Sequence, residues 1–161
     1  MATIGELQPQ DWHEFRGIRM RALADAPDAF GVTLADVERQ PEDAWRDRLS
    51  APDPILVVRE GGSPVAMGAG WTPPDRSGLM AVWGMWTAPE ARGQGHARSL
   101  LTWLLDWAGA HEITTAELHV SEGNDGARRL YEQHGFEATG RWEPLREGSD
   151  LQMELLRRSG S

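Results

Sequence analysis

The residues that decide the fold are Met85-Trp86-Thr87-Ala88-Pro89-Glu90-Ala91-Arg92-Gly93-Gln94-Gly95-His96-Ala97-Arg98-Ser99-Leu100. An extended run ends at Thr87, Pro89 interrupts it, and a turn with two glycines leads into a helix. We predict this helix over residues 95–109, because its apolar residues recur every three or four positions and form one stripe. The stripe consists of Ala97, Leu100, Leu101, Leu104, Leu105 and Ala108.

The glycine turn has the properties of a phosphate-binding site. The N–H groups in the first turn of a helix have no partner within it and lie at the positive end of the helix dipole. Gly93 and Gly95 lack side chains, so a pyrophosphate can approach the backbone closely, and Arg98 can pair with it. A glycine pair before a helix is, however, also typical of a tight connection that binds no ligand.

The same residues exclude two other phosphate-binding motifs. A dinucleotide fingerprint requires G-x-G-x-x-G, but Arg98 stands in the place of the third glycine. A Walker-type loop requires a lysine, and all 16 basic residues of this chain are arginines.

Outward from this turn, strand-like and helical segments follow one another in the order β-α-α-β-β-β-α-β-α-β-β. Hairpins combined with strand–helix–strand units predict an α+β fold, a mixed sheet with helices on its faces. The strands are expected at 3–7, 54–60, 65–71, 79–87, 115–120, 136–141 and 150–156, and the helices at 11–24, 41–49, 95–109 and 125–134.

Local signals refine this prediction. Asp11 and Glu14 have the spacing of a capping box, and Asn124 is placed to cap the last helix. Strict alternation along the strand over 79–87 would put Trp83 and Trp86 on opposite faces of the sheet.

Composition narrows the class of protein. The chain has 161 residues, which predicts a single domain over 1–161, and it has no cysteine for disulfides or thiolate metal sites. No signal peptide and no apolar run of the ~20 residues that a membrane span needs is visible, so we expect a cytoplasmic protein that does not bind membranes. The net charge of −9 argues against nucleic-acid binding and would suit a cationic partner.

The pattern Arg92-x-x-Gly95-x-Ala97 resembles the Q/R-x-x-G-x-G/A signature of the GNAT acetyltransferases, in which such a turn holds the pyrophosphate of CoA. The resemblance implies the GNAT fold: a mostly antiparallel sheet of six to seven strands with about four helices, splayed between the strands over 79–87 and 115–120. It also implies that the backbone at Met85, Trp86 and Thr87 pairs with the pantetheine amides. The diphosphate would be held around Arg92, Gly93, Gln94, Gly95, His96, Ala97 and Arg98.

A second segment resembles the same family. It reads Asn124-x-x-Ala127-x-x-Leu130-Tyr131-x-x-x-Gly135-Phe136 and lies about 30 residues downstream. The resemblance implies that Tyr131 lies beside the CoA sulfur and that Asn124 touches the pantetheine arm. The matching region extends over residues 82–141, whereas residues 11–60, which shape the acceptor pocket in this family, match only loosely.

Acyl transfer to an amine needs a protonated leaving thiol and a polarised carbonyl. Tyr131 is the candidate general acid, because a phenol with an ordinary pKa near ~10 is protonated at neutral pH, and the chain has no other tyrosine. A backbone N–H in the region of Met85 to Thr87 is the candidate donor to the oxyanion. His119 is the candidate general base, since imidazole accepts a proton near neutral pH, and Glu117 has the same facing and is the next candidate.

The resemblance therefore implies an N-acetyltransferase that uses acetyl-CoA and no metal. The expected acceptor is a small or cationic primary amine that attacks directly in a ternary complex. A protein N-terminus or lysine as acceptor, and a non-catalytic acyl-CoA-binding module, are the alternatives. A homodimer formed through a sheet edge is left open.

Overall fold

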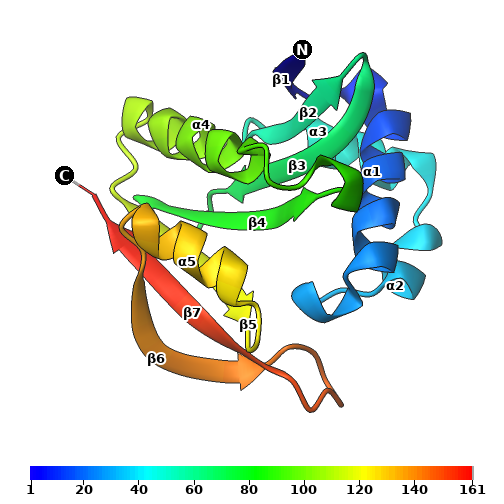
Figure 1. Ribbon diagram of the computed structural model, residues 1–161. Coiled ribbons are helices and arrows are strands. Elements are labelled where there is room, and N and C mark those ends of the chain that lie inside the picture. Colours follow the sequence, from blue (N-terminus) through cyan, green and yellow to red (C-terminus); the bar gives the residue numbers. More distant parts are fainter. Residues whose placement is uncertain (161) are drawn as a thin grey trace.

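The computed structural model describes residues 1–160 and contains one seven-stranded mixed sheet (Figure 1). The strand order is β1-β2-β3-β4-β5-β7-β6, and all pairs are antiparallel except β4 with β5. Each predicted strand is present, and the mixed sheet is confirmed. The strands are β1 Ala2–Glu6, β2 Ile55–Glu60, β3 Ser63–Trp71, β4 Leu79–Thr87, β5 Thr115–Ser121, β6 Glu137–Pro144 and β7 Gln152–Ser159.

The four predicted helices are also present, together with one short helix that was not predicted. The helices are α1 Trp12–Asp25, α2 Leu34–Glu38, α3 Glu42–Ser50, α4 His96–Ala110 and α5 Asp125–Gln133, with 3-10 turns η1 Pro9–Asp11, η2 Pro27–Ala29 and η3 Pro89–Ala91. The unpredicted α2 has five residues, too few for a periodic pattern, and Thr33 and Asp36 begin it as a capping box. None of the helices in residues 1–160 is long and apolar enough to cross a bilayer.

Two hydrophobic cores lie on opposite faces of the sheet. On one face α4 and α5 pack against the strands, and Leu100, Leu101 and Leu104 of the predicted stripe are fully buried there. On the other face α1, α2 and α3 cover the sheet around Phe15 and Trp45 (Figure 1). The apolar stripe of α4 is therefore buried, as its periodicity predicts. This packing fixes the turn before α4 at the edge of a core.

The sheet opens between β4 and β5. Their parallel pairing extends only from Leu79 with Thr115 to Ala81 with Glu117, and then the strands diverge. The predicted splay is thereby confirmed. Because β4 continues to Thr87, its edge towards β5 lacks a strand partner over the second half of its length, and unpaired strand edges offer N–H and C=O groups to a ligand.

A β-bulge lies in the same half of β4. Met67 pairs with Trp86 and Ala69 pairs with Trp83, so β4 has one residue more than β3 in this interval. Gly84 takes up the extra length with a φ of 68°, a value that favours glycine. The bulge turns Trp83 and Trp86 to the same face, where both pack with the α1 core, so the predicted opposite facing is wrong.

The predicted capping box of α1 is also wrong. Asp11 precedes the helix, but its carboxylate accepts a hydrogen bond from the backbone N–H of Gln8 at 2.9 Å instead of capping α1. Glu14 accepts two hydrogen bonds from Arg59 on β2, at 2.8 and 2.6 Å. The Glu14 carboxylate, which a capping box would need, is therefore engaged in an ion pair with Arg59 on a distant strand.

Candidate active site

A groove of about 740 Å³ runs over the end of β4, the glycine turn and the starts of α4 and α5. It brings together residues that the sequence analysis singled out from two segments more than 25 residues apart. Gln94 is exposed and does not line it. The predicted residues that do line it are Met85, Trp86, Thr87, Arg92, Gly93, Gly95, His96, Ala97, Arg98, Asn124 and Tyr131.

The floor of the groove at the turn is bare backbone. Gly93 and Gly95 have φ values of 81° and 83°, and a Cβ built on either would meet nothing within 4 Å. Ser99 is the residue whose N–H bonds back to the carbonyl of Gly95, at 3.0 Å. The N–H groups from Gly95 to Arg98 are thus the ones that a helix start leaves for capping groups or ligands.

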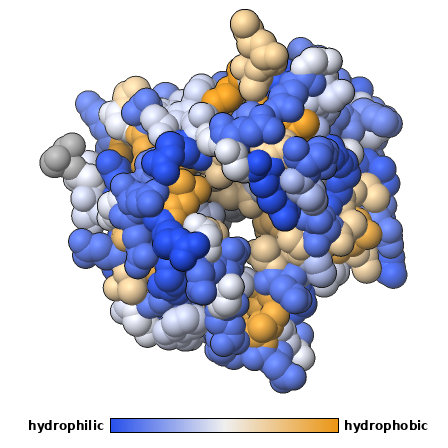
Figure 2. All heavy atoms as spheres, viewed as in Figure 1, coloured by the Kyte–Doolittle hydropathy of each residue, from blue (hydrophilic) through white to orange (hydrophobic). Residues whose placement is uncertain are grey.

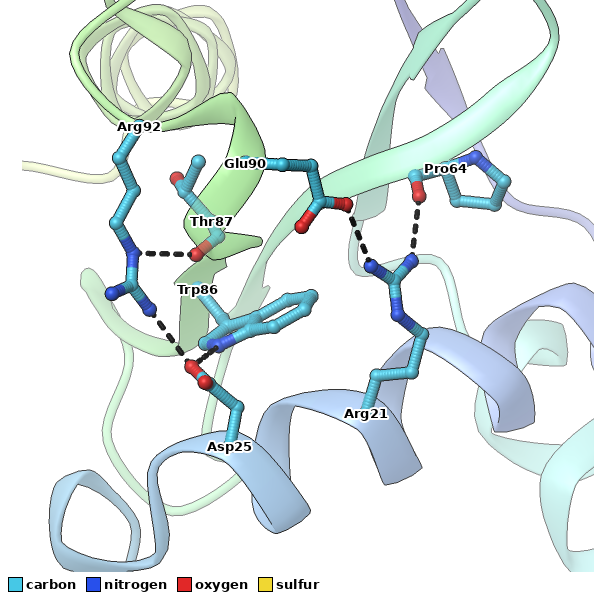
Figure 3. A network of polar contacts seen from close by, with 7 residues as sticks. All are labelled: Arg21, Asp25, Pro64, Trp86, Thr87, Glu90 and Arg92. Atoms are coloured by element: carbon cyan, nitrogen blue, oxygen red, sulfur yellow. Dashed lines mark hydrogen bonds and ion pairs between the residues drawn. The ribbon is translucent and has the colours of Figure 1, made fainter.

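Three side chains fix this turn to the end of α1 (Figure 3). Arg92 donates to the carbonyl of Thr87 at 3.0 Å and to Asp25 at 2.8 Å. The same carboxylate oxygen of Asp25 accepts from the indole N–H of Trp86 at 2.9 Å. Asp25 therefore holds the side chains of both Arg92 and Trp86, and it ties the turn to the end of α1.

Asp25 is expected to contribute measurably to stability through this network. Its replacement by alanine leaves the nearly buried indole N–H of Trp86 without its acceptor, which should lower the free energy of unfolding by about 1–3 kcal/mol. Urea denaturation of Asp25→Ala measures this change, with Asp28→Ala, an exposed acid on the following turn, as the control. Equal midpoints for Asp25→Ala and wild type would show that the network does not hold the turn.

The side chains of His96 and Arg98 differ in how freely they can contact a ligand. His96 is buried, and its Nε2 lies 2.7 Å from Oε1 of Glu60, so it contributes to the groove mainly by its backbone. Arg98 is exposed and donates to the side chain of Gln133 on α5 at 2.8 Å. An exposed guanidinium at the mouth of the groove can exchange this neutral partner for a phosphate.

On the α5 side of the groove, Asn124 accepts a hydrogen bond from the N–H of Ala127, which confirms it as the N-cap. Tyr131 lies about two turns further along α5, is 7% exposed, and packs edge-on against Phe136 with 6.0 Å between ring centroids. Burial raises the pKa of the Tyr131 phenol to about 12, because the phenolate would lose its hydration. The hydroxyl therefore keeps its proton at neutral pH.

A second cavity of about 300 Å³ lies in the splay between β4 and β5. It shares Phe30, Met85, Asn124 and Tyr131 with the groove, so the two spaces meet beside the phenol. In the view of Figure 2, the surface of the molecule is hollowed between the part built by α5 and the part built by α1. A ligand in the groove and a second ligand in the cavity can thus meet at Tyr131.

His119 lines this second cavity, whereas Glu117 does not. The imidazole Nε2 of His119 lies 3.5 Å from Oε1 of Glu143, and both side chains are exposed. Glu117 is buried between Arg157 and Arg76; burial alone would raise its pKa, but the hydrogen bonds from the two arginines outweigh this and lower it. Such a carboxylate is a weak base, so we keep His119 and not Glu117 as the candidate general base.

Arg19 was not singled out from the sequence, yet it lines the second cavity. It is 5% exposed, and its guanidinium carbon lies 5.0 Å from the ring centroid of Phe30 and 5.3 Å from that of Trp83. Burial, and then the charge of Arg48, lower its pKa to about 10, so it remains a cation at neutral pH. The sequence did contain a signal for this residue. Arg19 lies four residues from both Phe15 and Leu23 and so falls on the buried stripe of α1, where an arginine is unusual.

The fold and the two adjoining cavities define a protein that can hold two ligands that meet at the splay between β4 and β5. A model of the Acetyltransferase (GNAT) family matches residues 15–136, most of the chain. The chain therefore belongs to the GNAT acetyltransferase family, and the fold expected from the resemblance is confirmed.

Individual proteins that are similar to this chain are also named acetyltransferases. The mycothiol acetyltransferase of Beutenbergia cavernae is 26% identical over 136 residues, which cover 84% of this chain and 44% of that protein. The chain thus spans less than half the length of this curated relative. Among solved structures, a GNAT acetyltransferase from Streptococcus pneumoniae has a TM-score of 0.86 at 18% identity and full coverage of both chains. The structure of yncA from Salmonella typhimurium with its cofactor acetyl-CoA has a TM-score of 0.78 at 19% identity, covering 100% of this chain and 95% of that one.

Proposed function

We propose that this protein transfers the acetyl group of acetyl-CoA to a small primary amine, by direct attack of the amine within a ternary complex. The observation that carries this proposal is the junction of the two cavities at Tyr131. One space has a bare backbone turn suited to a diphosphate, and the other lies where an acceptor can approach.

The residues of the groove fit the parts of acetyl-CoA in sequence. The N–H groups from Gly93 to Arg98 would hold the diphosphate, and the unpaired edge of β4 at Met85 to Thr87 would pair with the pantetheine amides. Asn124 would contact the pantetheine arm from the α5 side. When bound, acetyl-CoA supplies an acetyl group activated as a thioester.

The chain's own residues would then move two protons. The amine nitrogen bonds to the acetyl carbon as the bond from that carbon to sulfur breaks, while a backbone N–H beside the Gly84 bulge polarises the carbonyl. The Tyr131 hydroxyl gives its proton to the departing sulfur and later recovers one from solvent. His119 takes the proton that the amine loses, directly or through water.

The size and charge of the second cavity bear on the acceptor. Its volume of about 300 Å³ is at the lower end of the range of about 300–1,000 Å³ for small-molecule sites, which supports a small amine. The net charge of −9 had favoured a cationic acceptor, but no aspartate or glutamate in residues 1–160 lines this cavity. We therefore retain the small amine and not the cationic character.

The names of the relatives do not settle the acceptor. The matched proteins are named mycothiol acetyltransferases, but this chain covers 44% of the first and 38% of another, from Acidimicrobium ferrooxidans. Their acceptor belongs to proteins about twice as long, and a direct assay is needed for this chain.

Release of free CoA thiol from acetyl-CoA, followed with a thiol reagent over a panel of small primary amines, tests the function. The chain itself has no cysteine, so the reagent reports on CoA alone. We expect amine-dependent release together with an N-acetylated product in the mass spectrum. Release with peptides only would indicate a protein acetyltransferase, and tight binding of acetyl-CoA without release would indicate a binding module.

His119→Asn is expected to lower kcat/KM about 100-fold, the lower end of the effect of a general base, because the variant keeps a polar side chain but cannot take the proton that the amine loses. The pH profile of kcat/KM for His119→Asn and wild type measures this. Glu143→Gln, which changes the neighbour of His119 and keeps the imidazole, is the control. Superimposable profiles would remove His119 from the reaction.

A further inference from the structure

Five polar or charged side chains are buried in the described part of the chain, and they fall into two groups. Three have partners: Glu117 binds Arg76 and Arg157, Glu154 binds Arg128, and His96 contacts Glu60. Two have buried atoms without any hydrogen-bond partner in residues 1–160, namely Nε and Nη1 of Arg19 and Oγ of Ser121.

Both residues of the second group line the same cavity, the one in the splay beside Tyr131. Buried polar atoms in folded proteins are almost always paired, and an uncompensated buried charge destabilises the fold strongly. Because both exceptions line one cavity, we expect the partner that they lack to be a ligand of that cavity.

The charge around Arg19 indicates the sign of this ligand. The charged side chain that most affects Arg19 is Arg48, a second cation, and both guanidinium groups lie within about 5.5 Å of the Trp83 ring centroid. Phe30 and Trp83 hold the Arg19 group by cation–π contacts but satisfy none of its N–H donors. The cavity therefore presents a fixed, desolvated cation and no acid.

Given the proposed acetyl transfer, we propose that the acceptor is an amine that also carries a carboxylate, and that Arg19 binds this carboxylate. The planar fork of a guanidinium matches the two oxygens of a carboxylate and forms the strongest type of hydrogen-bonded ion pair. Ser121 Oγ lies at the end of β5 in the same cavity and offers the acceptor one further hydrogen bond. The acceptor class is thus a small amino acid, whose amine points to Tyr131 while its acid group faces Arg19.

Matched acceptors test this class. Each α- or ω-amino acid of a panel is compared with its amide and with its decarboxylated amine, and aminoalkyl phosphonates form a further arm for other anions. For the best acceptor we expect kcat/KM roughly 100-fold above that of its counterparts without the carboxylate, the effect of losing hydrogen bonds to a charged group. A phosphonate that exceeds every carboxylate would overturn the carboxylate as the recognised group.

Variants of Arg19 test whether this side chain causes the preference for acceptors with a carboxylate. Arg19→Met should remove the discrimination between carboxylate and amide acceptors and leave the KM of acetyl-CoA unchanged. Arg19→Lys, which keeps the charge but not the fork, should keep part of it, and Arg48→Gln, an exposed arginine at the same aromatic ring, should keep most of it.

Stability gives a readout that does not depend on turnover. Removing an uncompensated buried cation should leave the Tm of Arg19→Met equal to or above that of wild type, and the preferred amino acid should raise the Tm of wild type alone. A lower Tm for Arg19→Met with unchanged acceptor preference would make Arg19 a structural residue and overturn the proposal.

Two different results would separate the carboxylate site from the proposed acetyl transfer. CoA release with equal efficiency for amino acids and for amines without a carboxylate would refute the carboxylate site and leave the acetyltransferase intact. No release with any amine, although acetyl-CoA binds, would refute the function and the acceptor site together.

Discussion

Replacing Tyr131 with phenylalanine is expected to lower kcat about 100-fold, the effect of losing a positioned general acid, and to leave the Kd of acetyl-CoA close to that of wild type. The phenyl ring keeps the packing against Phe136 and the walls of both cavities, so only the hydroxyl is lost. Single-turnover rates and calorimetric binding of acetyl-CoA separate the two effects. Equal rates for variant and wild type would remove Tyr131 from the mechanism.

The raised pKa of Tyr131 gives this prediction a pH dependence. Because burial raises the pKa to about 12, the phenol stays protonated, and able to donate, throughout the range below that value. The activity of wild type should therefore show no alkaline fall due to this residue up to roughly pH 10, the ordinary pKa of tyrosine. The chain has one tyrosine, so its ultraviolet titration reports on Tyr131 alone. Ionisation near the ordinary pKa would contradict the buried position of the hydroxyl.

Gly95→Glu is expected to raise the Kd of acetyl-CoA more than 100-fold, by two effects of similar direction. A carboxylate would stand where the diphosphate is proposed to bind, which opposes like charges at close range. In addition, Gly95 has a φ of 83° at the N-cap of α4, a conformation that side chains rarely adopt. Isothermal titration of acetyl-CoA into the variant measures the loss.

Gly148→Glu is the matched control for this substitution. Gly148 has a φ of 80°, is exposed, has open space around it, lies in the loop between β6 and β7, and does not line the groove. The same charge and the same backbone strain are introduced, so affinity should stay at the wild-type value. Retained binding by Gly95→Glu, or equal losses in both variants, would discredit the turn as the diphosphate site.

The order of elements could be predicted because each depends on local periodicity. The stripe from Ala97 to Ala108 places α4, and the apolar run that ends before Pro89 places β4, since both patterns are written in neighbouring residues. Failures occurred where a distant residue competes with a local motif. Glu14 would complete a capping box with Asp11, but the ion pair with Arg59 on β2 occupies it.

The site was predictable in part for the same reason. The glycine turn and the cap at Asn124 are local, whereas the facing of Trp83 and Trp86 depends on a bulge that alternation does not include. Gly84 within a strand was a signal of that bulge. Arg19 escaped notice because its importance comes from what is missing around it, and the absence of a partner can be seen only once the neighbours are in place.

The proposed function depends on one contact above all, the binding of the CoA diphosphate by the backbone N–H groups from Gly93 to Arg98. Nitrogen-15 NMR of this 17.9 kDa chain during titration with CoA tests it directly, because each of these amides gives its own signal. We expect the amides of Gly93 to Arg98 to shift most, and to shift downfield as N–H groups do when they gain an anionic acceptor. Shifts confined to other parts of the chain, or none at millimolar CoA, would contradict it.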